Sequence, residues 1–545
     1  MDSAVLLDAA VVTRCRRRVH LEHDPAAVDA PRAALDSTTQ RRIADAAVHR
    51  RLIADRLADC LAADWAEVSP ELPAEQRCAA TLALLIQGAP FVWGGLLPAD
   101  PRGGRRGGVE LLVRHRGGYL PVIVVRHKVT DPGSGARTSP LAQPVPAAAR
   151  NDPDRKVRPQ SRDQLRLAHA VRLLQAAGFM AHGRATGGAI GLEADVVVWH
   201  DLDSATWPGG RTAMAEYDAR FADRLAVALA AATEGTPLAQ PSRITECRSC
   251  PWWPTCGPVL RASRDISMVL RGEDVVVLRE AGVSTVDALA ALDPAGEPPV
   301  PMVGMSLRDA VLLARAWQQD LTLVRRNWRI AVPRADVEVD VDMESFDEAG
   351  AYLWGCLLSG SDIRIPGGYR AFVTWEPVPT PDEARSFAAF WRWLTDVRCR
   401  AAALGLSFSA YCYNEQAENR WMLSSAERFA GVPGIPTVAA VEEFIFSDQW
   451  VDLYGVIGAE FLCAHGKGLK TIAPAAGFSW HDPEASGENS MRWYSDAVGM
   501  GGGEPDLAQR ARLLTYNADD VHATRALRLW MSSDQVNDVP YAGDL

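Results

Sequence analysis

Four acidic residues alternate with apolar ones along residues 337–345, VEVDVDMES. If this segment is a β-strand, its valines and methionine share one face, and its acids, Glu338, Asp340, Asp342 and Glu344, share the other. Carboxylates on one face repel one another, and a buried carboxylate is costly unless a cation lies beside it. Oxygen ligands of this kind suit Mg²⁺ or Mn²⁺. The segment therefore predicts either a divalent-metal site or a solvated acidic face.

A second acidic motif lies within residues 506–531, which have the periodicity of a long amphipathic helix. Tyr516 and Asp520 are four positions apart, so both side chains leave the same helix face. Asp520 can then ligate a metal while the Tyr516 hydroxyl orients an attacking water. Asp519 falls on another face, and we expect it to be solvated.

These motifs, with a third between them, resemble the DEDD site of RNase H-like exonucleases. In the middle motif Glu418 follows Asn414, with Ala417 in place of the usual aromatic residue and Glu in place of Asp; Glu415 is the alternative acid. The resemblance implies that two Mg²⁺ or Mn²⁺ ions are held by four carboxylates, those of Asp342, Glu344, Glu418 and Asp520.

The resemblance also implies an activity, the 3′→5′ exonucleolytic hydrolysis of DNA or RNA. Tyr516 would orient the attacking water. Asp340 would be a neighbouring acid or, in a shifted register, the first ligand. Leu469-Lys470, Gly477-Phe478 and the segment SGENSMRWY further resemble the YprB-like branch of this superfamily.

Four of the ten cysteines are spaced like metal ligands. Cys247, Cys250 and Cys256 form a C-x2-C-x5-C motif in a loop rich in proline and tryptophan. A tetrahedral site needs a fourth ligand, and Cys15 is the best candidate. The arrangement resembles the iron–sulfur staple of RecB-type nucleases, in which a [4Fe–4S] cluster joins the two ends of the domain. Zn²⁺ is the alternative metal.

A RecB-type domain would carry a PD-(D/E)xK metal site between the ends of the staple, and here that motif is incomplete. His49 matches the early histidine of the family, and Glu110 stands in place of an aspartate. If Lys128 is the family lysine, Arg126 replaces the second acid. A site without this acid cannot hold a metal in the usual way, so we expect a degenerate centre. The alternative is that His49 and Glu110 have ordinary structural roles.

A helix expected over residues 163–178 would complete that centre with a glutamine and a tyrosine. Arg166 and Ala170 occupy these places in the best register, whereas Gln164 fits another register. The remaining arginine, histidine and lysine side chains can still hold a phosphate backbone.

The two resemblances divide the chain into three parts and classify it as α/β. A RecB-type, restriction-endonuclease-like domain covers residues 1–262, and an RNase H-like domain with a mixed sheet flanked by helices covers residues 331–545. Residues 263–330 form a helical linker, in which helices around Gly282 suggest either a helix-hairpin-helix or a plain spacer. The whole chain thus resembles a two-domain family of RecB-like nucleases.

Composition limits the remaining choices. The chain has 545 residues, enough for two to four domains, and no apolar run approaches the roughly 18 residues of a membrane span. It lacks a clear signal-peptide pattern, so we expect a cytoplasmic protein without membrane contact. A net charge of −11 argues against nucleic-acid binding by bulk charge but allows local basic grooves.

We therefore expect a metal-dependent nuclease whose partner is nucleic acid, with single strands or 3′ ends as substrate. A helicase or repair factor is compatible with this interpretation as a further partner. The alternative is a catalytically silent module that binds nucleic acid or a protein.

Overall fold

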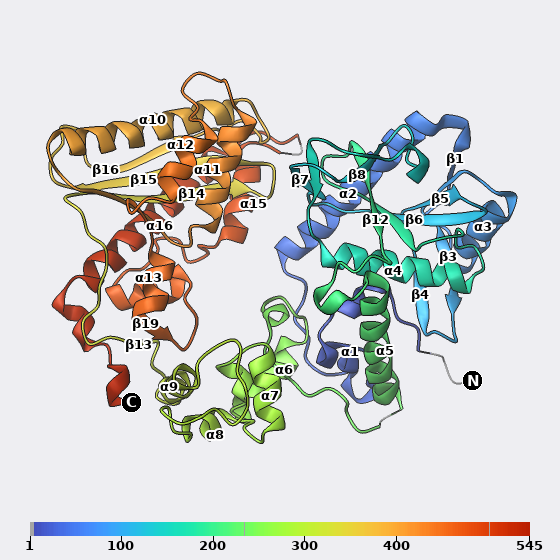
Figure 1. Ribbon diagram of the computed structural model, residues 1–545, viewed down its shortest axis with the longest axis horizontal. Helices are drawn as coiled ribbons and strands as arrows, with labels where there is room; N and C mark the ends of the chain where they lie inside the picture. Colours follow the sequence, from blue (N-terminus) through green and yellow to red (C-terminus); the bar gives the residue numbers. More distant parts are fainter. Residues whose placement is uncertain (1–4, 234, 501) are drawn as a thin grey trace. The chain divides into compact units, whose positions relative to one another are not determined.

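The computed structural model describes residues 5–233, 235–500 and 502–545. Its contacts divide the chain into two compact units, one ending at Leu260 and the other beginning at Arg261 (Figure 1). Within the described ranges, none of the helices combines the length and apolar character needed to span a membrane.

An eight-stranded mixed sheet forms the centre of the N-terminal unit, in the order β1-β2-β5-β6-β11-β12-β8-β9. Its strands are β1 (Trp65–Glu67), β2 (Phe91–Trp93), β5 (Leu111–His115), β6 (Gly118–Val124), β8 (Arg137–Pro140), β9 (Arg150–Asn151), β11 (Thr186–Ile190) and β12 (Val196–Asp201). Strand β6 is buried along its whole length, as its run of apolar residues predicts for a central strand. Two smaller sheets pair β3 (Leu96–Asp100) with β4 (Arg105–Gly108) and β7 (Thr130–Pro132) with β10 (Arg155–Val157).

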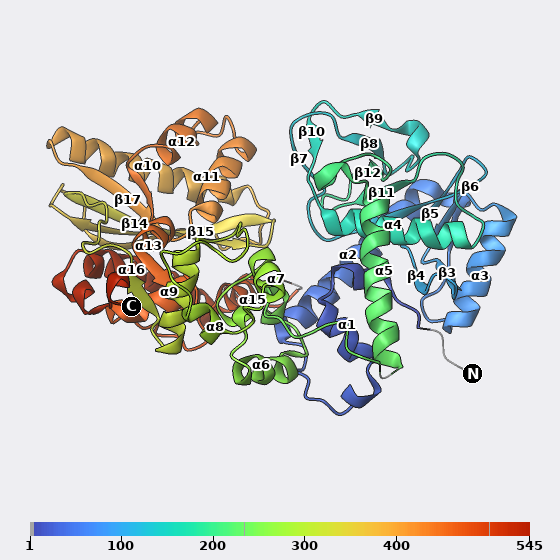
Figure 2. The ribbon, with the colours of Figure 1, turned by 60° about the horizontal axis from the view of Figure 1, so that its bottom comes forward.

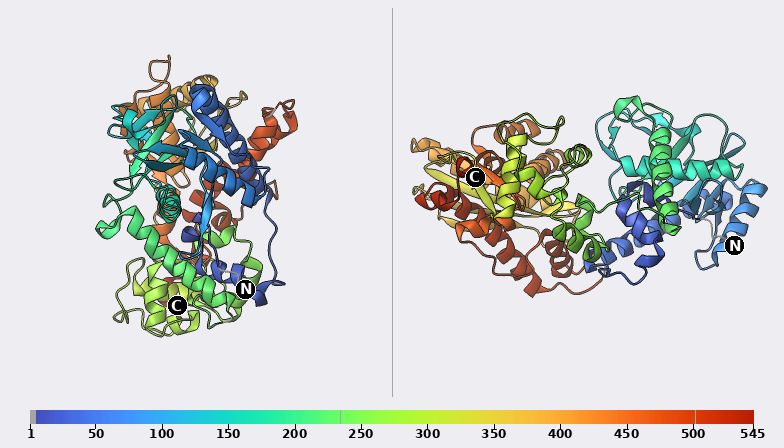
Figure 3. Two further views of the ribbon diagram at one scale, coloured as in Figure 1. Left: turned by 90° about the vertical axis from the view of Figure 1, so that its right-hand side faces the viewer. Right: turned by 90° about the horizontal axis from the view of Figure 1, so that it is seen from below.

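The helices of this unit are α1 (Arg16–His23), α2 (Ser37–Leu61), α3 (Ala74–Gln87), α4 (Ser161–Ala176) and α5 (Ala213–Ala232), and α6 (Trp253–Ala262) crosses the boundary between the two units. Helix α4 buries its apolar residues against β6 and β11, which confirms the predicted helix at this place. Helices α4 and α5 pack together and cross steeply (Figures 2 and 3).

The C-terminal unit contains a five-stranded mixed sheet in the order β16-β15-β14-β17-β18. Its strands are β14 (Val337–Phe346), β15 (Gly350–Gly360), β16 (Gly368–Val373), β17 (Phe408–Cys412) and β18 (Trp450–Asp452). Strand β14 pairs antiparallel with β15 and parallel with β17. It therefore lies at the centre of the sheet, where both of its faces must be covered.

Two long helices cover the two faces of this sheet. Helix α10 (Asp382–Ala403) packs on the apolar face of β14, where Val339 and Val341 join one core with Phe390. Helix α16 (Leu507–Met531) lies across the acidic face (Figure 1). The predicted strand and helix are confirmed. The solvated-face alternative is wrong, because Asp340 is 0% exposed under α16.

The remaining elements connect these layers. They are α11 (Gln416–Arg428), α12 (Val438–Ile445), α13 (Leu453–Glu460), α14 (Leu469–Ile472), α15 (Gly487–Ala497) and the pair β13 (Leu323–Arg325) and β19 (Phe461–Cys463). Before them come α7 (Glu273–Glu280), α8 (Val286–Ala290) and α9 (Leu307–Gln318), whose contacts belong to the C-terminal unit. As predicted, a turn at Gly282 precedes α8, and the Thr285 side chain caps this helix.

Candidate active site

Three carboxylates meet between the central strand and the last long helix of the C-terminal unit. Asp342 and Glu344 leave the same face of β14, because they are two positions apart on a strand. Asp520 faces them from α16. Each side chain offers an oxygen within 4.8 Å of the oxygens of the other two. The structure thus brings together three of the four predicted metal ligands.

The surroundings of these acids disfavour their ionised forms. Burial, followed by the charges of Asp520, Glu344 and Glu418, raises the pKa of Asp342 well above its usual range. Burial and the charge of Asp520 raise the pKa of Glu344 to about 8, and burial also raises the pKa of Asp520. A divalent cation would offset this repulsion, and the oxygen-only donor set fits Mg²⁺ or Mn²⁺.

Glu418 lies in the first turn of α11, beside this cluster and outside it. It is 4% exposed, and its Oε2 atom has no hydrogen-bond partner among the described residues. Burial raises its pKa to about 8. A buried carboxylate oxygen without a hydrogen-bond partner, beside three other acids, fits a ligand for a cation. The alternative acid, Glu415, precedes the helix and is only half-buried.

Three polar side chains orient the acids by hydrogen bonds. Asn517 donates from Nδ2 to Asp342 Oδ2 at 2.7 Å. The Ser490 hydroxyl donates to Glu344 Oε2 at 2.8 Å. The indole of Trp480 donates to Asp520 Oδ1 at 2.7 Å. Sequence reasoning missed these roles, although the three-residue spacing of Asn517 and Asp520 on one helix face could have indicated the first.

Tyr516 and Lys470 form the edge of the cluster. The Tyr516 hydroxyl accepts a hydrogen bond from Lys470 Nζ at 2.9 Å and is itself bonded to Asp520. Lys470 Nζ lies 4.0 Å from Asp520 Oδ1, and its charge lowers the pKa of Asp342, Glu344 and Asp520. The cluster therefore contains a tyrosine hydroxyl and one ammonium group beside its acids.

Two other acids of the motifs have different surroundings. Arg528, at 0% exposure, donates to Asp340 Oδ2 at 2.8 Å and also bonds Glu338, so Asp340 has a guanidinium partner and does not join the cluster. Asp519 was expected to be solvated, and this expectation is wrong. It is 3% exposed because the loop at His481 folds over the helix, donating to Asp519 from its backbone N–H at 2.9 Å.

A sequence model of the RNase H superfamily matches residues 422–532. The matched segment contains Lys470, Tyr516 and Asp520. The C-terminal domain is RNase H-like. A domain of this superfamily indicates a nuclease-type function, the hydrolysis of phosphodiesters in nucleic acid. Strand β14 and Glu418 lie outside the match, so their place at the site rests on the geometry alone. No curated protein and no solved structure matches the chain.

In the N-terminal unit, the four predicted cysteines line one small cavity. Cys15 immediately precedes α1, and the other three cysteines line the same cavity from the loop and helix at residues 247–256. The Cys15 backbone N–H donates to Glu246 Oε2 at 2.7 Å, which ties the two segments together. Burial raises the pKa of Cys256 to about 11 and also raises that of Cys15. A bound metal would instead stabilise the thiolates. Among the described residues, however, the four cysteines line a common cavity without forming a converged set of ligand atoms like that of the carboxylate cluster.

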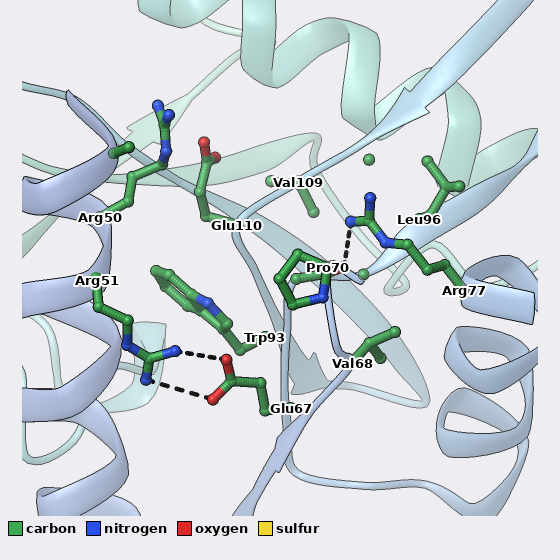
Figure 4. Close-up of a pocket in the computed structure, with 14 residues that line it drawn as sticks. Arg50, Arg51, Glu67, Val68, Pro70, Arg77, Trp93, Leu96, Val109 and Glu110 are labelled. Atoms are coloured by element: carbon green, nitrogen blue, oxygen red, sulfur yellow. Dashed lines mark hydrogen bonds and ion pairs between the residues drawn. The ribbon is translucent and has the colours of Figure 1, made fainter. Parts of the chain in front are cut away.

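In the N-terminal unit, three of the side chains predicted around a degenerate centre take part in ion pairs. Arg166 bonds Glu110, and Arg126 pairs with Asp45 at 3.3 Å. Among the described residues, Glu110 belongs to no group of three metal-ligand side chains. Figure 4 shows Glu110 beside a cavity of about 530 Å³, across from Trp93.

The other predicted residues of this centre are dispersed. His49 is buried and bonds the carbonyl of Gly191 at 3.2 Å. Lys128 lies near Glu193, where burial raises the pKa of the carboxyl group and the charge of the lysine opposes that rise. Gln164 accepts a hydrogen bond from the Trp207 indole at 2.8 Å.

Proposed function

We propose that the C-terminal domain is a metal-dependent exonuclease that hydrolyses DNA or RNA from the 3′ end. The observation that carries this proposal is the convergence of Asp342, Glu344 and Asp520 within one hydrogen-bonded cluster. Tyr516, bonded to Asp520, supports the tyrosine-bearing DEDD type and with it the 3′→5′ direction.

In this proposal Asp342, Glu344, Asp520 and Glu418 would hold two Mg²⁺ or Mn²⁺ ions. When bound, such ions supply Lewis acidity toward the phosphodiester and its attacking water. The Tyr516 hydroxyl orients that water by accepting or donating a hydrogen bond. Asn517, Ser490 and Trp480 hold the carboxylates in one arrangement, which limits the reorganisation needed before reaction.

Single-turnover cleavage of a 3′-labelled oligonucleotide, with and without Mg²⁺ or Mn²⁺, tests this proposal. We expect Asp342→Asn and Asp520→Asn each to slow cleavage by about 100-fold or more, because each removes a charge from the metal site. Asp519→Asn is the matched control, since it changes an adjacent buried acid outside the cluster. Full activity in both cluster variants would refute the assignment. Loss of cleavage in Glu110→Gln alone would assign catalysis to the N-terminal unit.

We further propose that the N-terminal unit is a RecB-type domain that binds nucleic acid without cutting it. The ion pair between Arg166 and Glu110 supports this, because a guanidinium neutralises the carboxylate that a metal would need. The four clustered cysteines would hold a structural [4Fe–4S] cluster, with Zn²⁺ as the alternative.

A further inference from the structure

The N-terminal unit contains a basic cavity of about 570 Å³. Its basic lining residues are His115, Arg116, Arg137, His182, Arg184 and His200. Asp201 is the one acid among its lining residues. Nothing in the motifs of the chain or in the RNase H superfamily match accounts for this cavity.

The topology of the sheet explains why these residues meet. The cavity lies where β5 and β12 end and where β6, β8 and β11 begin. These five strands are neighbours in the sheet, and their directions bring the five ends to one edge. Leu120, near the start of β6, lines this cavity, whereas Val124, at the end of β6, lines another cavity, of about 620 Å³, whose lining includes Arg126, Arg162 and Arg166. Leu120 and Val124 are four positions apart on an extended strand, which corresponds to roughly 13 Å along the strand.

Two glycine-containing loops shape one wall of the cavity. A Cβ atom on Gly183 would lie 3.5 Å from the guanidinium of Arg116, and one on Gly117 would lie 3.3 Å from the ring of His182. The Arg116 guanidinium thus lies over Gly183, and the His182 ring lies over Gly117. The backbone N–H of His182 also donates to the carbonyl of Arg116 at 3.4 Å. The two loops therefore hold these basic groups together at the cavity.

The charges of the cavity are only partly balanced. Arg184 pairs with Asp201 at 2.7 Å. Within the described part of the chain, Arg116 and Arg137 have no ion-pair partner. This local excess of positive charge occurs in a chain whose net charge is −11. An anion inside the cavity would provide the missing counter-charge.

We propose that this cavity binds a phosphate monoester, as carried by a nucleoside monophosphate or by the 5′ end of an oligonucleotide. Guanidinium groups match phosphate oxygens in charge and in hydrogen-bond geometry, and histidine rings add further donors. A volume of about 570 Å³ exceeds what inorganic phosphate needs and lies in the range of small-molecule sites. The proposal goes beyond the nuclease function, and it does not depend on the acids of the C-terminal domain.

Isothermal titration calorimetry on the full chain tests the proposal. A chelator in the buffer removes divalent cations, so phosphate binding is measured independently of the nuclease site. The ligands are inorganic phosphate, a nucleoside 5′-monophosphate, and one short oligonucleotide with a 5′-phosphate or a 5′-hydroxyl. We expect the 5′-phosphorylated ligands to bind and the 5′-hydroxyl oligonucleotide to bind at least about tenfold more weakly.

Variants assign the binding to this cavity. We expect Arg116→Gln and Arg137→Gln each to weaken binding by about tenfold. Arg137→Lys should have an affinity between those of the wild type and Arg137→Gln, because lysine keeps the positive charge but lacks the paired N–H donors of a guanidinium. Arg162→Gln is the matched control, since Arg162 lines the other basic cavity of the unit. Both substituted arginines are exposed, and thermal melts verify that the variants fold.

The two sources of phosphate give different results, and both support the site. Stronger binding of the mononucleotide identifies a free nucleotide as the ligand, whereas stronger binding of the 5′-phosphorylated oligonucleotide identifies a strand end. Wild-type protein that binds none of the ligands at millimolar concentration would overturn the proposal. So would a loss of binding in Arg162→Gln with full binding in Arg116→Gln and Arg137→Gln.

Discussion

Lys470 donates a hydrogen bond of 2.9 Å to the hydroxyl of Tyr516, and the same ammonium group lies 4.0 Å from Asp520. It also lies over the Tyr516 ring, 4.5 Å from the centroid. The side chain that could orient water is therefore itself oriented by a lysine 46 positions earlier in the chain. The Tyr-x3-Asp motif contains no sign of this partner.

Replacing Lys470 by methionine should slow the reaction by about 10- to 100-fold in kcat, with a smaller change in KM. The Tyr516 hydroxyl would lose its donor, and the acids would lose their nearby positive charge. Lys467→Met is the matched control, because the Lys467 ammonium lies over the Tyr454 ring at 4.0 Å. Steady-state cleavage of a 3′-labelled oligonucleotide measures both variants. Equal kcat for the two would contradict the role of Lys470.

Without metal, the protein should lose stability as the pH rises. Glu344 and Glu418 have folded-state pKa values of about 8, whereas an unfolded glutamate titrates near 4.3. Between these values the folded protein holds protons that the unfolded chain releases, so the free energy of unfolding falls with increasing pH. In chelator, the Tm should therefore decrease from about pH 5 to about pH 8.

Two comparisons check this pH dependence. Glu418→Gln should flatten the decrease, because the glutamine carries no titrating proton. Mg²⁺ should also reduce the decrease of Tm with pH, since a bound cation stabilises the ionised carboxylates. A Tm that rises over this pH range in chelator would show that the pKa values of Glu344 and Glu418 are not raised as described.

Arg528 should be essential for the stability of the C-terminal unit. It is buried between Asp340 and Glu338, and Arg528→Met would leave Asp340 without its buried counter-charge, whereas Glu338 would keep its pair with Arg334. We expect a loss of about 3–5 kcal/mol in the free energy of unfolding, measured by urea denaturation. Arg525→Met, one turn earlier on α16, should cost less than about 1 kcal/mol. Equal losses for the two variants would contradict the account.

Substitution of Asp340 should lower the stability of the protein, whereas substitution of Asp342 should lower kcat. Asp340→Asn weakens the pair with Arg528, so we expect lower stability and retained kcat at a temperature where the variant is folded. Asp342→Asn removes a member of the carboxylate cluster, so kcat should fall while the Tm in chelator rises or stays constant. A loss of kcat in Asp340→Asn equal to that in Asp342→Asn would make Asp340 a ligand.

The cysteine cavity should bind metal only when its four thiols are intact. Anaerobic purification followed by iron and zinc analysis and absorption spectroscopy should show iron with the broad visible absorption of an iron–sulfur cluster. Cys15→Ser should lose this metal and lower the Tm, because Cys15 lies far in sequence from the other ligands and joins them in the fold. Cys463→Ser, outside the cavity, should retain it. A colourless wild-type protein with one zinc would refute the cluster.

Some features of the site follow from local sequence alone. Alternating valines and acids specify the strand that ends at Phe346, and helical periodicity specifies the helix that begins at Leu507. The four-residue spacing of Tyr516 and Asp520 places both on one helix face. The short spacing of three cysteines likewise calls for a fourth ligand. Each of these relationships depends on backbone geometry over a few residues.

The tertiary structure decided which residues of these patterns work together. Alternation places Asp340 and Asp342 on the same strand face, so the strand pattern cannot distinguish them. Their separation depends on where α16 crosses the strand, which sets Arg528 beside Asp340 and Asn517 beside Asp342. The pairing of Arg166 with Glu110 is likewise a contact between distant segments. Such contacts depend on how separate elements pack, and no local periodicity encodes that packing.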